Sequence, residues 1–321
     1  MTDSSPAPSM SDGEMDSDDH ASEQPYTLFR KYYRQREDVL TLINQINQLI
    51  KVVQKHRGVS MGLLAGDDSY LPRFNSLQAE MEKRLTLLQC FARSTGGALS
   101  DREKENLHLA WATIRQDWQD DKLSDNFELH THFVEQLQAM LSSLSRQMER
   151  PLLPELVEGD TGAGMSYPRL FKKIEILNFV ARQLPDMIEQ VAKVRGLSVY
   201  AATAGSVDFY SDRKLRYLLQ CAREQNDKLR VQAERIHDHV EKGLDSFDEL
   251  KNLELKLLYL LNTVEHDVLS GLEIKTPSQQ FFTLATEIID VYWSLVSDGL
   301  LQIRRWHEDD MNDWLSLPAE G

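Results

Sequence analysis

Cysteine, glycine and proline are scarce in this chain of 321 residues, and it contains no long apolar run. The two cysteines, Cys90 and Cys221, are too few for a disulfide scaffold. No stretch reaches the roughly 18 apolar residues that a membrane-spanning helix requires. The N-terminus has neither the basic region nor the apolar run of a signal peptide. These absences predict a cytoplasmic protein without a membrane-spanning segment.

Positive charge is also in the minority, with 36 Lys and Arg residues against 51 Asp and Glu, for a formal net charge of −15. A surface of this sign repels phosphate groups, so we expect neither nucleic acid nor a membrane as a partner. Part of the acidity is concentrated in residues 1–25, which hold Ser and Pro but no Lys or Arg. This composition predicts a disordered acidic tail.

The remaining residues show heptad-like apolar spacing that is nearly continuous, and 41% of the chain is apolar. This pattern predicts an all-α fold. Residues 151–166 contain two prolines and three glycines, which predicts a linker between a first four-helix bundle at 26–150 and a second at 167–315. Eight helices are expected, at about 26–64, 72–93, 100–120, 124–150, 168–204, 211–242, 246–271 and 276–314. Ser100 and Glu103 have capping-box spacing, and Pro185 should interrupt the fifth helix.

Short motifs recur in the same order in the two halves. LFRK at 28–31 resembles LFKK at 170–173, and LLQC occurs at 87–90 and at 218–221. An arginine-glycine step also occurs twice, as KHRGVSMGLLAG at 55–66 and KVRGLSVYAATAG at 193–205. We interpret the halves as diverged repeats that place Arg57 and Arg195 near a pseudo-two-fold axis.

Both arginines lie on the apolar stripe of their predicted helices. Arg57 continues the stripe of Ile46, Ile50 and Val53, and Arg195 continues that of Ile188 and Val191. A guanidinium stays charged at ordinary pH, so burying it alone costs free energy. Since neither arginine has an obvious acidic partner nearby in the sequence, the pattern predicts a small anion as the missing counter-charge.

Each arginine is followed by a glycine and, three residues on, by a serine. Ser60 and Ser198 fall about one turn beyond their arginines, on the same side, and could supply hydroxyls to the same ligand. Gly58 and Gly196 each lower the stability of their helix by roughly 1 kcal/mol relative to alanine. We therefore expect either a close approach by another backbone or local flexibility at both glycines.

With these motifs in place, the chain resembles the nitrate- and nitrite-sensing (NIT) domain of bacterial receptors and transcription antiterminators. The resemblance rests on Arg57-Gly58-Val59-Ser60 with LLAG at 63–66, on Arg195-Gly196-Leu197-Ser198, and on residues 277–290, PSQQFFTLATEIID. It covers about residues 26–315. It implies two four-helix bundles that bind nitrate or nitrite between Arg57 and Arg195, without a further cofactor.

A planar anion with several acceptor oxygens suits the planar donor fork of a guanidinium. Members of the family usually carry an output module, but only about seven residues follow Trp314 and they include no basic RNA-binding segment. The resemblance therefore implies a sensor that acts on a separate protein effector, and family analogy implies a homodimer. Binding should draw the helices together and so change the bundle geometry.

Two other functions remain open at this stage. The first is a helical protein-interaction scaffold with structural arginines, which an acid close to both arginines in space would favour. The second is an enzyme that holds an anionic substrate, although no general base stands beside either motif in the sequence. Paired histidines at 130 and 132, and at 237 and 239, are two residues apart on helices and diverge, so we expect solvated histidines and no metal site.

Overall fold

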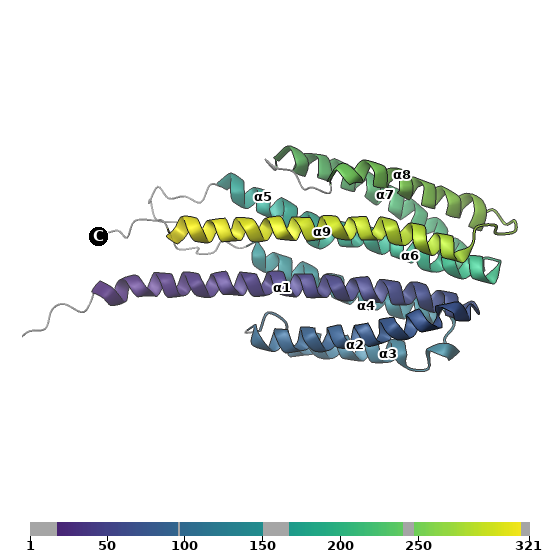
Figure 1. Ribbon diagram of the computed structural model, residues 1–321, viewed down its shortest axis with the longest axis horizontal. Coiled ribbons are helices and arrows are strands. Elements are labelled where there is room, and N and C mark those ends of the chain that lie inside the picture. Colours follow the sequence, from purple (N-terminus) through teal and green to yellow (C-terminus); the bar gives the residue numbers. More distant parts are fainter. Residues whose placement is uncertain (1–17, 96, 150–166, 240–246, 316–321) are drawn as a thin grey trace, which may run out of the picture.

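The computed structural model describes residues 18–95, 97–149, 167–239 and 247–315, and all its regular elements are helical. Long, roughly antiparallel helices lie along one axis (Figure 1). No strand occurs in these four ranges, so the predicted all-α class is confirmed. None of the helices in the same ranges combines the length and the apolar character needed to cross a membrane.

The first half of the described chain runs from α1 to α4. Its elements are α1 (Asp18–Leu64), the 3₁₀ turn η1 (Asp68–Tyr70), α2 (Leu71–Ser94), α3 (Asp101–Arg115), the 3₁₀ turn η2 (Trp118–Asp120) and α4 (Leu123–Met148). The predicted capping box starts α3: Ser100 Oγ accepts from the Glu103 N–H at 3.2 Å, and the Glu103 carboxylate accepts from the Ser100 N–H at 2.8 Å.

The second half runs from α5 to α9. Its elements are α5 (Tyr167–Asn178), the π-helical segment η4 (Phe179–Gln183), α6 (Leu184–Ala204), α7 (Phe209–His239), α8 (Phe247–Thr263), the π-helical segment η5 (Val264–Val268) and α9 (Ser278–Leu315). The predicted interruption before Pro185 is confirmed. Because proline has no N–H to continue the α-helical ladder, the chain widens there, and the Leu184 N–H donates to the Phe179 carbonyl five residues back.

The N-terminal boundary differs from the prediction. Helix α1 begins at Asp18, so it includes residues 18–25 of the predicted tail. The sequence there contains Ala, Glu and Gln, which are good helix formers, and its first residues are acidic, which favours a helix N-terminus. Residues 1–17 of the predicted tail, and the predicted linker at 151–166, lie outside the described residues.

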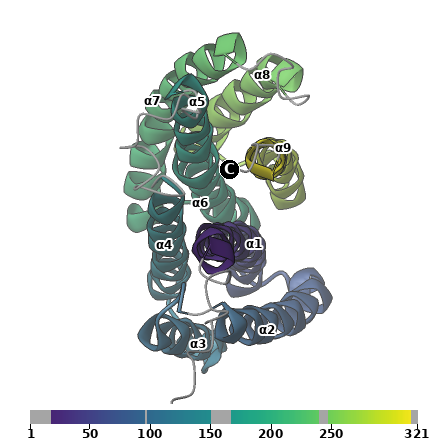
Figure 2. The same ribbon diagram turned by 90° about the vertical axis from the view of Figure 1, so that its left-hand side faces the viewer.

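Helices α1 and α6 occupy the centre of the molecule. Helix α1 packs on α2 and α4 on one side and on α6 and α9 on the other, while α6 also packs on α7 and α9. Figure 2 shows α1 between the α2–α4 layer and the helices of the second half. The α1–α6 contact is nearly as extensive as that between α1 and α2. The halves thus share one core, and their division into two separate bundles remains a prediction.

Candidate functional site

Arg57 and Arg195 face each other across the α1–α6 contact, and both side chains are completely buried. A Cβ atom added to Gly58 would lie 3.2 Å from Arg195 Nε, and one added to Gly196 would lie 3.9 Å from Arg57 Cγ. Each arginine therefore passes over the glycine that follows the other. At Gly58 the expected close approach comes from the Arg195 side chain and not from another backbone, whereas the contacts at Gly196 are ordinary ones.

Arg57 is held by groups from α4 and α6. Its guanidinium lies 5.2 Å from the centre of the Phe127 ring and donates to Thr131 Oγ1 at 3.1 Å. The Thr131 hydroxyl in turn donates to the Phe127 carbonyl at 2.8 Å, so its lone pairs face the arginine. The third group is Glu189, whose carboxylate accepts from Arg57 Nη1 at 2.7 Å and from Nη2 at 3.1 Å.

Arg195 has a matching environment on α9. Its guanidinium lies 5.0 Å from the Phe282 ring centre and donates to Thr286 Oγ1 at 2.9 Å. The Thr286 hydroxyl donates to the Phe282 carbonyl at 2.6 Å. The other contact is different, because Nη2 donates to the Gln54 backbone carbonyl at 2.6 Å. Both hydrogen-bond acceptors of Arg195 are therefore neutral.

The similarity extends to the ion pairs around the arginines. Lys55 and Lys193 each stand two residues before an arginine, and Asp290 and Glu135 each stand four residues after one of the threonines. Lys55 Nζ lies 3.9 Å from Asp290, and Lys193 Nζ lies 3.9 Å from Glu135. Equivalent residues thus make equivalent contacts in the two halves, which supports the predicted repeat of the arginine motif.

Glu189 breaks this equivalence. It is buried on α6, six residues before Arg195, whereas the corresponding position on α1 is Lys51. Gln54 Nε2 donates to its Oε2 at 2.9 Å. The expectation that no acid lies near the arginines is wrong for Arg57, because its partner comes from a different helix. The available signal in the sequence was an acid between the buried positions Ile188 and Val191.

Arg195 remains a buried cation without a carboxylate at ion-pair distance in the part of the chain that the structure describes. Within the same residues its Nε has no hydrogen-bond partner. Burial lowers the pKa of Arg195 to about 9, and the charges of Arg57 and Arg73 act in the same direction. A pKa of about 9 keeps the guanidinium charged at neutral pH.

The two serines are both buried but are used differently. Ser60 Oγ donates to the His56 carbonyl on its own helix at 2.9 Å. The Ser198 hydroxyl has no hydrogen-bond partner among the described residues. Of the two predicted supporting hydroxyls, that of Ser198 is therefore the one left available for a ligand.

A buried histidine pair lies next to Arg57. His56 Nδ1 is 2.8 Å from His130 Nε2, and His130 Nδ1 is 2.8 Å from the Asn126 carbonyl. If His130 donates to that carbonyl, its Nε2 accepts from His56, so both rings are neutral. Burial lowers the pKa of His56 well below its usual value, and burial together with the charge of Arg57 lowers that of His130 to about 3.

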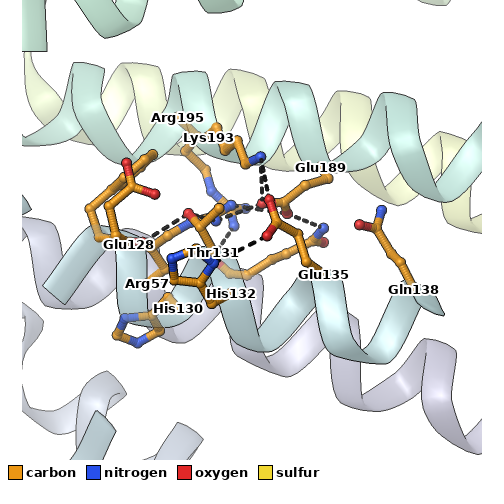
Figure 3. Close-up of polar contacts among 12 residues, drawn as sticks. Arg57, Glu128, His130, Thr131, His132, Glu135, Gln138, Glu189, Lys193 and Arg195 are labelled. Atoms are coloured by element: carbon orange, nitrogen blue, oxygen red, sulfur yellow. Dashed lines mark hydrogen bonds and ion pairs between the residues drawn. The ribbon is translucent and has the colours of Figure 1, made fainter. Parts of the chain in front are cut away.

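The prediction of solvated histidines is thus wrong for His130, which lies in the α1–α4 contact. His132 is exposed and contacts Glu135, so the two rings diverge as expected. The side chains of the other predicted pair, at 237 and 239, lie outside the described residues. Figure 3 shows His130 below Arg57, and Glu189 and Lys193 together on the α6 side of the site.

A polar pocket of about 230 Å³ lies between α1 and α9. Its lining includes Lys51 and Asp290, which are partly exposed and form an ion pair at 3.0 Å. Lys51 stands about one turn before Gln54, and Asp290 one turn after Thr286, the two residues that accept from Arg195. The pocket therefore begins about one helical turn from the acceptors of Arg195.

Searches for similar proteins found no family model, no curated protein and no solved structure that matches this chain.

Proposed function

We propose that this protein is a sensor that binds nitrate or nitrite at Arg195, beside Arg57, in the α1–α6 contact. The observation that carries the proposal is the completely buried Arg195 guanidinium, whose hydrogen-bond acceptors are neutral. An ion removed from water without a counter-charge costs several kcal/mol. Two guanidinium groups against the single carboxylate of Glu189 leave about one unit of positive charge, which a monovalent anion balances.

The chemistry of the site favours a planar oxyanion. A guanidinium offers coplanar N–H donors, and nitrate and nitrite present coplanar acceptor oxygens at matching spacing. The Ser198 hydroxyl is available as a further donor. Chloride offers no pair of acceptor atoms to a fork of donors, and sulfate carries twice the charge that the site lacks. We therefore expect nitrate and nitrite to bind more tightly than either.

A ligand at this position touches the elements that hold the molecule together. Arg195 links α6 to α9 through Thr286 and to α1 through the Gln54 carbonyl. An anion that takes over these donors changes the contacts among three helices at once, which is the rearrangement by which the sensor signals. It acts without chemical conversion of the anion, in the cytoplasm and as a homodimer. Its signal goes to a separate protein effector, for which the exposed Leu255, Leu258 and Tyr259 of α8 offer an apolar surface.

Calorimetric titration tests the proposal. Purified protein is titrated with nitrate and nitrite, with chloride and sulfate for comparison, and Arg195→Met is titrated in parallel. Arg230→Met is the matched control, because Arg230 is exposed and its contact with Glu234 is long, at 3.7 Å. We expect saturable nitrate or nitrite binding in the wild type and in Arg230→Met, and none in Arg195→Met. Equal heats for all three proteins would contradict the proposal.

The second candidate is a helical protein-interaction scaffold with structural arginines. The observation that favours it is the two-point ion pair between Arg57 and Glu189, which supplies Arg57 with a counter-charge from the chain itself. In a scaffold, nitrate neither binds nor changes stability, and replacing Arg195 affects only stability. The same titration therefore separates the two functions.

A further inference from the structure

The carboxylate of Glu189 occupies the place that a planar anion takes at an arginine. Its two oxygens accept from the two Nη atoms of Arg57 at 2.7 and 3.1 Å, and Gln54 Nε2 supplies a third donor at 2.9 Å. A carboxylate is a planar, monovalent group with two acceptor oxygens, and nitrite shares all three properties. Among the described residues, the chain thus places an anion of its own at Arg57 and none at Arg195.

Glu189 also has a second cation within reach. Lys193 stands one turn after Glu189 on α6, and its Nζ lies 3.7 Å from Glu189 Oε1. The same Nζ lies 3.9 Å from Oε1 of Glu135 on α4. Figure 3 shows dashed lines from the Lys193 ammonium group to both carboxylates. A side-chain rotation that moves Glu189 from Arg57 toward Lys193 therefore keeps its charge paired. Without such a partner, releasing Glu189 would leave a buried carboxylate alone.

We infer that Glu189 is an internal competitor that sets the anion affinity of the site. An incoming nitrate or nitrite displaces the Glu189 carboxylate from Arg57, the carboxylate moves to Lys193, and Arg57 and Arg195 then share the anion. This inference rests on the proposed function. It assigns Glu189 and Lys193 a role in regulating affinity, although neither needs to touch the bound anion.

The first test replaces the competitor by an uncharged group of the same shape. Glu189→Gln removes the negative charge and leaves both guanidinium groups without a carboxylate, so we expect nitrate to bind at least about tenfold more tightly than in the wild type. Glu287→Gln is the control, since Glu287 is exposed on α9 and paired with Lys256. It should bind nitrate as the wild type does.

A double-mutant cycle separates competition from a general loss of charge. Lys193→Met removes the position to which Glu189 moves, so it should weaken nitrate binding about fivefold or more when Glu189 is present. The same replacement in a Glu189→Gln background should have little effect, because the amide needs no cation. A purely structural role for Lys193 would give the same change in both backgrounds.

Thermal unfolding provides a readout for variants that fold poorly. Glu189→Ala leaves Arg57 without its carboxylate and should lower the melting temperature. Nitrate or formate at millimolar concentration should raise it again, whereas chloride at the same ionic strength should not. Arg57→Met/Glu189→Ala should respond less, because only the Arg195 guanidinium is left to bind the anion.

The outcomes distinguish this inference from the proposed function. Wild-type binding that is unchanged or weakened in Glu189→Gln would overturn the competitor and keep the sensor. If the wild type does not bind nitrate and Glu189→Gln does, the result would support Glu189 as a competitor but contradict nitrate sensing by the native chain. No binding by either, with no recovery of melting temperature in Glu189→Ala, would overturn both and leave the arginines structural.

Discussion

At the scale of single residues, Arg57 and Arg195 are alike in sequence and unlike in charge. Each crosses a glycine, lies over a phenylalanine and donates to a threonine one turn beyond it. Only the Arg57 guanidinium is paired with a carboxylate within the described chain. Removing one partner of a buried ion pair leaves the other charge buried and unpaired. The two arginines should therefore contribute differently to stability.

Replacement by methionine measures this difference. Arg57→Met leaves the buried Glu189 carboxylate without its guanidinium and should cost about 3–5 kcal/mol of unfolding free energy. Arg195→Met leaves only neutral acceptors unpaired and also removes a buried cation that has no carboxylate partner, so it should cost no more than about 1–2 kcal/mol. Urea unfolding at pH 7 without nitrate gives both values. Equal losses would mean that Glu189 does not depend on Arg57 for its counter-charge.

Sequence periodicity identified these arginines but not their partners. The stripe that contains Ile46, Ile50 and Val53 shows which face of α1 is buried, and so placed Arg57 inside. It does not show which residue of another helix meets that face. Glu189 lies 132 positions from Arg57 in the sequence, and this contact depends on how α1 and α6 are aligned along their lengths. That alignment is set by packing, which the pattern of one helix does not contain.

At the scale of helices, the two glycines of the repeated motif differ in the space around them. A Cβ at Gly58 would be 3.2 Å from Arg195 Nε and 3.3 Å from Phe282 Cε2, whereas the nearest atom at Gly196 would be Met61 Cγ at 3.5 Å. The first distances are shorter than usual contacts and the second is an ordinary contact. A Cβ at Gly58 thus requires the Arg195 and Phe282 side chains to shift by a few tenths of an ångström, whereas a Cβ at Gly196 fits without a shift.

The paired alanine substitutions should therefore have different effects. Gly196→Ala gains helix propensity and should stabilise the protein by up to about 1 kcal/mol. Gly58→Ala gains the same propensity but displaces the Arg195 side chain, so it should be neutral or destabilising and should weaken nitrate binding. Urea unfolding and calorimetry on both variants check this. Stabilisation of equal size in the two would show that Arg195 does not depend on Gly58.

Helix positions were more predictable than helix ends. Apolar periodicity extends over whole elements, whereas a boundary depends on a few local bonds. Ser100 and Glu103 carried a recognisable cap, and Pro185 a recognisable break, so both features were found in the sequence. The start of α1 at Asp18 has no comparable signal in an acidic, proline-containing segment.

At the scale of the whole molecule, three buried histidines link stability to pH. Burial lowers the pKa of His56 well below 6.5, that of His130 to about 3 and that of His307 to about 4. Between these lowered pKa values and pH 6.5, only the unfolded chain binds protons at these histidines. Their contribution to stability is therefore complete above pH 6.5 and is lost as the pH falls below it.

We expect the unfolding free energy to fall between pH 6.5 and 5, with a limiting slope of about 1.4 kcal/mol per pH unit for each histidine. His307→Gln should reduce the limiting slope by the contribution of one histidine, about 1.4 kcal/mol per pH unit. His132→Gln serves as the control, because that side chain is exposed, and should keep the wild-type slope. Urea unfolding across this range measures it. A wild-type curve that is flat below pH 6.5 would show that these rings do not remain neutral in the folded state.

The all-α class followed from the apolar spacing, but the arrangement of the halves did not. The repeated motifs predicted equivalent arginines, and the matching contacts on α4 and α9 agree with that. The extensive α1–α6 contact joins the halves into one core, and the binding site proposed here lies within that contact. The difference in charge pairing between the two arginines arises from one non-equivalent pair of positions, Glu189 and Lys51.

The most direct measurement is a pair of crystal structures of the wild-type protein, grown with nitrate and with chloride. If the excess charge of the α1–α6 contact is a receptor for a planar oxyanion, nitrate lies within hydrogen-bond distance of the Arg195 guanidinium, and chloride does not replace it there. If Arg195 donates only to Thr286 and the Gln54 carbonyl in both crystals, at nitrate concentrations far above those in cells, the protein is not a sensor of this anion.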